Sequence, residues 1–242
     1  MNETHASSPS PDLLSAAQAV AAGTDFAELA VCPAGLFWSE FRPQDAATRI
    51  WRWHDGATGC LTPEGFSVRS RVYEYGGGSF CLTDEAVVFV NEADQQIYLQ
   101  PFDSQTPRPL TQGDKLFGDV RYARGQILAV EEDKDTHRLV AFDVADGRRH
   151  VLAEGADFYA SPTVSPDGNR LVWIEWWRPH QPWTSTRLMS VERQADLAWG
   201  RPHCLAGGLG LESLQQPRFD EAGRLYCLTD RAGFWQPWVE TL

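Results

Sequence analysis

Apolar residues along this chain fall into short runs of strand length, and the runs occur in pairs separated by polar or turn residues. Aromatic and β-branched residues dominate the runs, which is typical of strands rather than helices. Between the pairs lie turn sequences such as SPDG at 165–168 and DEAG at 220–223, in which Asp and Gly favour a tight turn. Five pairs are visible: 36–41 with 49–55, 86–92 with 96–102, 126–133 with 138–144, 170–177 with 186–192, and 224–230 with 236–242.

The pairs recur along the chain, with a spacing of about 40 to 50 residues that is typical of four-stranded propeller blades. The residues that mark the repeat are Phe37, Val88, Leu128, Trp173 and Tyr226. A single blade cannot bury both of its faces, so blades stack side by side around an axis. The pattern therefore predicts an all-β fold, a β-propeller with five visible blades, and favours it over a sandwich with shorter connections.

The first residues differ from the rest of the chain. Residues 1–10 are rich in Ser and Pro, and residues 11–23 have a helical composition, which predicts one short helix. We expect residues 1–30 to form an amino-terminal extension and residues 31–242 to form the propeller domain.

The stretch RVYEYGGGSF at 71–80 directly precedes the second strand pair, as FYASPTVSPDG at 158–168 precedes the fourth. This position predicts an inner strand. Inner strands crowd at the propeller axis, where Gly76, Gly77 and Gly78 would permit close backbone approach. A phosphate-binding loop is the alternative, but it needs a following Lys and Ser or Thr and then a helix, whereas SFCLTDEAVVFV predicts a strand.

Composition narrows the range of partners and compartments. A net charge of −12 disfavours nucleic acid or an anionic membrane as a partner. The amino terminus does not resemble a secretory leader, and no run of apolar residues is long enough to cross a bilayer. The five cysteines include no C-x-x-C pair, so we expect free thiols and a cytoplasmic setting. The six histidines are scattered along the sequence, so we expect no metal or cofactor.

Catalytic motifs are absent from the sequence, and we assign no catalytic residue. No G-x-S-x-G motif occurs. The acidic stretch EEDKD at 131–135 lacks the Gly and the final Glu of a calcium-binding loop, and we interpret it as a solvated turn.

Two stretches remain as candidates for function. Arg71 and Glu74 flank the glycines on the predicted inner strand, where they could meet a ligand in the central channel or pair with each other or with a neighbouring blade. The stretch WWRPHQPW at 176–183 predicts an ordered aromatic loop that packs over a blade, rather than a platform on which nucleic acid bases stack.

Together these stretches resemble the amino-terminal β-propeller of the prolyl oligopeptidase family of serine peptidases, in the dipeptidyl aminopeptidase and acylaminoacyl-peptidase branch. The resemblance extends from about residue 11 to the end of the chain. Tyr73 stands where the family usually has His, and Thr184 where it usually has Asp. The residues that carry the motif are Tyr75, Gly76, Gly77, Gly78, Trp176, His180, Pro182 and Trp183.

The resemblance implies a non-catalytic propeller that gates access of short peptides to a catalytic α/β-hydrolase domain. That domain, with the family's Ser, Asp and His, would be the propeller's partner and lies outside this chain. The family's ring is usually seven-bladed, so five blades imply an incomplete propeller. The substrate-gating candidates are Glu74, Arg71 and Tyr73, and Glu74 is the candidate for binding a substrate's free amino terminus.

Two other functions remain open from the sequence. The chain could be a stand-alone propeller that acts as a protein-interaction module, in which case we expect a closed ring. An enzymatic propeller such as a lactonase would need acidic and His ligands converging on the channel, and the scattered histidines argue against it.

Overall fold

The computed structural model describes residues 23–196, 198–208, 210 and 212–240. In this part of the chain every regular element is a strand, and nothing in it forms a helix that could cross a membrane. The short helix predicted for residues 11–23 lies, apart from Gly23, outside the described residues.

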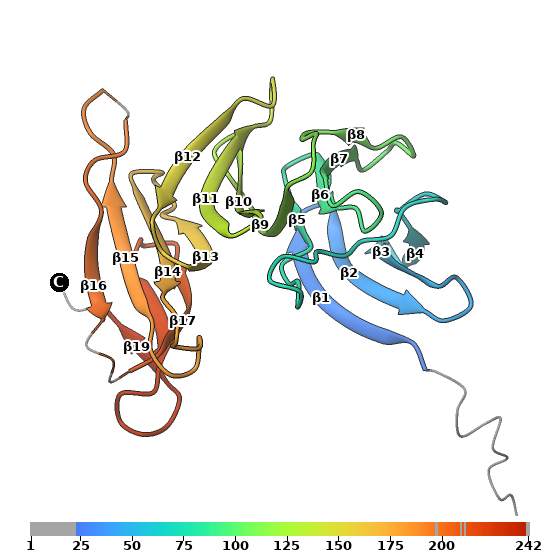
Figure 1. Cartoon of the computed structure of the whole chain (residues 1–242). Helices are drawn as coiled ribbons and strands as arrows, with labels where there is room; N and C mark the ends of the chain where they lie inside the picture. The colour runs from blue at the N-terminus through green and yellow to red at the C-terminus, as the bar shows by residue number, and fades with distance from the viewer. Residues whose placement is uncertain (1–22, 197, 209, 211, 241–242) are drawn as a thin grey trace, which may run out of the picture.

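The strands form five antiparallel sheets that follow one another along the chain (Figure 1). Each sheet is a meander, so consecutive strands are neighbours. The first sheet contains β1 (Asp25–Cys32), β2 (Gly35–Arg42), β3 (Ala47–His54) and β4 (Ala57–Cys60), and the second contains β5 (Phe80–Leu82), β6 (Ala86–Val90), β7 (Ile97–Pro101) and β8 (Arg108–Pro109). The third contains β9 (Leu116–Ala123), β10 (Gln126–Asp133), β11 (Thr136–Asp143) and β12 (Arg149–Glu154), and the fourth contains β13 (Phe158–Val164), β14 (Arg170–Trp176), β15 (Arg187–Glu192) and β16 (His203–Gly207). The fifth contains β17 (Leu214–Phe219), β18 (Leu225–Thr229) and β19 (Gln236–Val239).

The sheets are the blades of a β-propeller. Their first strands, β1, β5, β9, β13 and β17, contact one another in that order and form the inner wall. Figure 1 shows the blades fanning from β1–β4 at one end to β17–β19 at the other, so the described residues form an open arc. The prediction of an all-β propeller with five blades is confirmed.

The hydrophobic core lies between neighbouring blades, where each blade covers the face of the next. Trp173, Leu139 and Leu171 belong to the cluster between the third and fourth blades and are almost completely buried. Burial of one such side chain stabilises the fold by about 1.5 to 3 kcal/mol. Stacking of blades is therefore the main source of stability, as the repeat pattern implied.

All five predicted strand pairs are present, and their bounds shift by a few residues. The propeller begins earlier than the boundary predicted at residue 30, because β1 starts at Asp25. Asp25 and Glu28 interrupt the apolar residues of β1, so the strand lacks the long apolar run by which the other strands were predicted. Leu29 and Val31 in this strand are 69% and 72% exposed. The turns predicted at 165–168 and 220–223 form, with Gly168 N donating to Ser165 O and Gly223 N to Asp220 O.

The glycine-rich stretch is not the inner strand that the sequence predicted. Residues 72–75 form a turn, in which Glu74 N donates to Arg71 O and Gly76 N donates to Val72 O, both at 2.9 Å. Tyr73 and Glu74 take positive φ angles of 58° and 68°. The inner strand of this blade, β5, begins only at Phe80. The backbone of residues 71–76 thus makes local hydrogen bonds within the turn, and not the hydrogen bonds to a neighbouring strand that an inner strand would make.

The glycines do permit close backbone approach at two of the three positions. A Cβ on Gly76 would lie 2.1 Å from Ser70 O, and a Cβ on Gly78 would lie 2.3 Å from Asp119 Cα. A Cβ on Gly77 would meet no atom within 4 Å. The carbonyls of Gly77 and Gly78 accept hydrogen bonds from Asp119 N and Val120 N, each at 2.9 Å, which attaches the stretch to β9.

Candidate functional site: a cavity at the inner strands

Three inner strands share a bulge at the same place. Asp119 in β9, Ser161 in β13 and Gln216 in β17 have φ angles of 48°, 54° and 51°, and the pairing register shifts at each of them. A bulge re-aims side chains and commonly occurs beside functional sites. All three residues line one cavity.

This cavity has a volume of about 870 Å³, within the range of ligand-binding sites. The glycine-rich stretch forms one side of it. The turn between β10 and β11 forms a second side, and the start of β13 with the segment around Trp176–Trp183 forms a third. The cavity thus brings together the gating candidates Tyr73 and Glu74 with every motif residue except His180, namely Tyr75, Gly76, Gly77, Gly78, Trp176, Pro182 and Trp183.

Tyr73 is an anchor of the cavity wall. Its hydroxyl donates to Tyr159 O at 3.2 Å and accepts from Tyr159 N at 2.9 Å. Its ring makes edge contacts with His137 at 4.8 Å and Phe158 at 5.1 Å between centroids. Burial raises the pKa of Tyr73 above the usual value, so the hydroxyl stays protonated. A ring held on both sides in this way forms a fixed wall.

The carboxylates of the cavity differ in what they bind. Glu132 Oε2 accepts from Tyr73 N at 2.6 Å. Asp119 pairs with Arg121 Nη2 at 2.9 Å through Oδ1 and accepts from Ser161 N through Oδ2. Both carboxylates therefore hold protein structure in place.

Glu74 is in a different position. Its side chain is exposed, lines the cavity and makes no hydrogen bond or ion pair with any described residue. Across the turn between β10 and β11, Asp135 and Lys134 line the cavity with similarly unoccupied side chains. The cavity contains four carboxylates, from Glu74, Asp119, Glu132 and Asp135, against the two cations Lys134 and Arg178. Its charge favours a cationic group on a ligand.

Arg71 is not brought to this cavity. Its Nη2 atom pairs with Glu92 Oε1 at 3.2 Å, and Arg69 Nη1 lies 3.5 Å from the same oxygen. A hydrogen bond from Ser67 and the two arginines hold the pKa of Glu92 below its usual value. The sequence predicted that Arg71 would meet a ligand in the channel or pair with Glu74 or a neighbouring blade. Its partner Glu92 instead follows β6 of the same blade.

The aromatic segment at 176–183 divides between packing and exposure. Trp176 is buried and stacks on Phe158 with centroids 5.1 Å apart, as the packing interpretation expected. Trp183 is 62% exposed at the cavity rim, against that expectation, and Tyr75 is 88% exposed on the opposite segment. The Pro182 carbonyl accepts from Ser213 Oγ and from Gln215 Nε2, which fixes the rim to the fifth blade.

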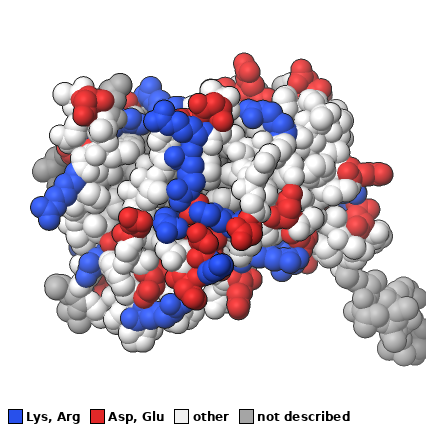
Figure 2. Space-filling view, turned by 45° about the horizontal axis from the view of Figure 1, so that its top comes forward, with Lys and Arg blue, Asp and Glu red and all other residues white. Residues whose placement is uncertain are grey.

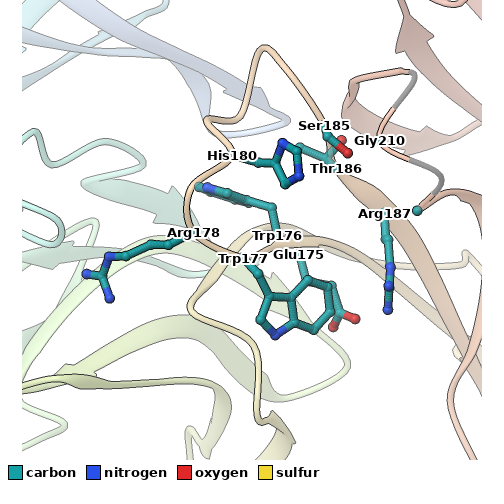
Figure 3. A pocket seen from close by; sticks show the side chains of 10 residues that line it. Glu175, Trp176, Trp177, Arg178, His180, Ser185, Thr186, Arg187 and Gly210 are labelled. Atoms are coloured by element: carbon teal, nitrogen blue, oxygen red, sulfur yellow. The ribbon is translucent and has the colours of Figure 1, made fainter.

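Sequence reasoning missed several cavity residues. Asp119, Ser161 and Gln216 reach the cavity because of their bulges, and non-glycine residues at positive φ leave no motif. Glu132 belongs to the acidic stretch 131–135 that the sequence analysis interprets as a solvated turn, and His137 follows that stretch. The interpretation is wrong for Glu131 and Glu132, which lie in β10, with Glu131 completely buried. His180, a motif residue, lines a smaller neighbouring cavity instead (Figure 3).

The side chains of the large cavity are suited to binding a ligand rather than to holding a metal ion or a polyanion. In the described part of the chain no three His, Cys, Asp or Glu side chains are grouped to hold a metal ion. His137 Nδ1 is occupied by the Asp157 carbonyl. On the face shown in Figure 2, a narrow column of basic side chains leads into an area of mixed acidic and basic side chains, so that face offers no broad basic surface for a polyanion.

Among the solved structures similar to this chain are three of puromycin-hydrolysing enzymes. A puromycin-hydrolyzing peptidase of Mycobacterium tuberculosis matches at 28% identity with a TM-score of 0.84, and the match covers 97% of this chain and 39% of that one. A puromycin hydrolase matches at 27% identity with a TM-score of 0.83, covering 95% and 39% of the two chains. A variant of puromycin hydrolase complexed with PGG matches at 26% identity with a TM-score of 0.84, covering 96% and 39%.

More distant matches support the fold alone. A prolyl endopeptidase superimposes with a TM-score of 0.60 at 12% identity over 90% of this chain and 37% of that one. No family model and no curated protein sequence matches the chain. The chain spans about two fifths of the length of these three puromycin-hydrolysing enzymes.

Proposed function

Because this chain has the fold of the amino-terminal β-propeller of the prolyl oligopeptidase family, we propose that it is the non-catalytic, substrate-gating part of a serine peptidase that acts on short peptides. Catalysis would come from an α/β-hydrolase domain, with Ser as nucleophile and His as general base. We place the enzyme in the cytoplasm, since all five cysteines are free thiols. Within the family we favour the dipeptidyl aminopeptidase and acylaminoacyl-peptidase branch on the motif at 71–78.

The observation that carries the proposal is the unoccupied carboxylate of Glu74 on an acidic, aromatic cavity. A short peptide with a free amino terminus carries a cation, and such a cation binds a carboxylate by a charge-assisted hydrogen bond. The apolar wall of Tyr73, Phe158 and Trp176 offers contact area for the first side chains of the peptide. The narrow space between bulged inner strands would exclude folded proteins.

The exposed aromatic rim fits contact with the catalytic domain. Tyr75 and Trp183 are large, largely exposed and held on segments that are hydrogen-bonded to the blades. Exposed aromatics of this kind are enriched at protein interfaces. We propose that they border the cleft between the propeller and the hydrolase domain.

Kinetics of the enzyme that contains this chain test the role of Glu74. In Glu74→Gln, kcat/KM for peptides with a free amino terminus should fall about tenfold or more, the size expected from loss of one charged hydrogen bond. Cleavage of amino-terminally blocked peptides should stay unchanged. Glu85→Gln, an exposed carboxylate outside the cavity, is the matched control. An equal effect of Glu74→Gln on free and blocked peptides would remove Glu74 from amino-terminal recognition.

A further inference from the structure

A second cavity, of about 290 Å³, lies in the fourth blade beside the large one (Figure 3). The two cavities share Trp176 and Arg178 in their linings. In Figure 3 Glu175, Trp177 and Arg187 lie toward one end of the smaller cavity, and His180 and Ser185 lie toward the other. Neither Glu175 nor Arg187 lines the large cavity.

Glu175 is a buried carboxylate with incomplete hydrogen bonding. It is only 7% exposed, and Oε2 accepts from Trp173 Nε1 at 2.9 Å. Its other oxygen has no partner among the described residues. Burial raises the pKa of Glu175, and the Trp173 hydrogen bond and the charge of Arg187 offset this only in part. A carboxylate so placed is costly unless a cation meets it.

Arg187, which carries the opposite charge in this cavity, also lacks a hydrogen-bonding partner among the described residues. It lies directly across from Glu175 in the register of β14 and β15, a spacing at which opposite charges normally interact. No hydrogen bond or ion pair joins the two side chains. The guanidinium lies over the ring of Trp177, 4.5 Å from its centroid, and has no hydrogen-bond acceptor among the described residues. Two opposite charges thus line one cavity without pairing.

We propose that this cavity binds a small zwitterion, a free α-amino acid or a dipeptide, with its ammonium group on Glu175 and its carboxylate on Arg187. The guanidinium offers the fork of donors that suits a carboxylate. The indole of Trp177 and the buried Ser185 wall the remaining space. The volume lies at the lower end of the range for ligand sites and limits the ligand to about the size of a dipeptide.

The proposal goes beyond gating of substrate access. Cleavage of short peptides releases such zwitterions, so on the proposed function the site would sense a product. Binding itself requires no peptidase activity. A binding measurement at the smaller cavity can therefore fail or succeed independently of the kinetic test of Glu74, which lines the other cavity.

Calorimetric titration of the purified protein tests the site with leucine, phenylalanine and glycyl-leucine. At least one of them should bind. Its amino-terminally acetylated and carboxyl-amidated derivatives, which each lack one charge, should bind at least tenfold more weakly. Comparison of leucine with glycyl-leucine decides between amino acid and dipeptide. Failure of all three zwitterions to bind, or equal binding of the zwitterion that binds and its two neutralised derivatives, would overturn the proposal.

Variants locate the binding. Glu175→Gln retains an acceptor for Trp173 and should weaken binding at least tenfold, as should Arg187→Gln. Glu192→Gln, an exposed carboxylate at the end of the same strand β15, should leave binding unchanged, and so should Glu74→Gln. Full binding by Glu175→Gln would place the ligand elsewhere and contradict the assignment. If a variant fails to fold, the derivative series on the unaltered protein still decides.

Discussion

The hydroxyl of Tyr73 bonds both the carbonyl and the amide of Tyr159, a residue 86 positions later in the chain. This relationship ties the glycine-rich stretch before the second blade to the inner strand of the fourth. Tyr159 itself is 1% exposed, so little solvent is available to replace these hydrogen bonds. The wall of the large cavity thus depends on a contact that spans two blades.

Tyr73→Phe should therefore destabilise the protein by about 1 to 3 kcal/mol, because it leaves two buried backbone groups without a partner. Urea unfolding measures the loss. Tyr122→Phe is the matched control, since its hydroxyl only approaches Asp84 at 3.5 Å on the exposed surface. Equal stability of the two variants would show that the Tyr73 hydroxyl does not anchor the cavity wall.

The glycines of the same stretch should respond differently to Ala. Gly76→Ala and Gly78→Ala place a Cβ against backbone atoms at 2.1 and 2.3 Å, so both should destabilise the fold strongly. Gly77→Ala meets open space and should cost about 1 to 3 kcal/mol, from its φ of 119° alone. Thermal unfolding of the three variants ranks them by their loss of stability. A greater loss for Gly77 than for Gly78 would contradict the close approach.

Glu131 in β10 is completely buried and should control acid stability. Arg149 contacts both of its oxygens at 2.7 Å, and Lys115 and Arg138 lie within 3.5 Å. Burial acts to raise the pKa of Glu131, but the Arg149 bond and the nearby charges outweigh it and lower that pKa. A lowered folded-state pKa contributes stability above the unfolded value of about 4.3, and this stability is lost as the pH falls below it.

Glu131→Gln should accordingly lower the free energy of unfolding at pH 7 by about 3 to 5 kcal/mol, because it leaves three cations around a neutral group. The variant should also lose less stability than the unaltered protein between pH 5 and 3. Glu154→Gln, whose side chain is 68% exposed, should change little. Parallel acid sensitivity of Glu131→Gln and the unaltered protein would contradict the assignment.

The exposed apolar side chains of β1 predict that the isolated chain associates with itself. Phe26, Leu29 and Val31 are 69%, 69% and 72% exposed on this first inner strand. A strand with such exposed apolar residues promotes association. Light scattering should show mass increasing with concentration, and Leu29→Glu with Val31→Glu should reduce it. A monodisperse monomer at all concentrations would contradict this prediction.

Particular elements show how far the sequence predicts this molecule. The strand pairs around Val88 and Trp173 are read directly from apolar runs, because both faces of a central blade strand are buried. The strand β1 was missed because Asp25 and Glu28 interrupt its apolar residues. The motif at 71–78 pointed to the large cavity, but its turn could not be foreseen, since Tyr73 and Glu74 adopt positive φ without being glycine. The bulges at Asp119, Ser161 and Gln216 depend on contacts between blades and have no local signal.

Cross-linking tests the central claim, that the large cavity receives the amino terminus of a short peptide at Glu74. A carbodiimide joins a carboxylate to an amine in direct contact, and mass spectrometry locates the bond. A short peptide with a free amino terminus and an amidated carboxyl end should be cross-linked to Glu74. In a separate control, the amino-terminally acetylated form of the same peptide has no free amine and should not be cross-linked to Glu74, even in excess. Cross-links at Glu85 and other exposed carboxylates outside the cavity, without one at Glu74, would contradict the account.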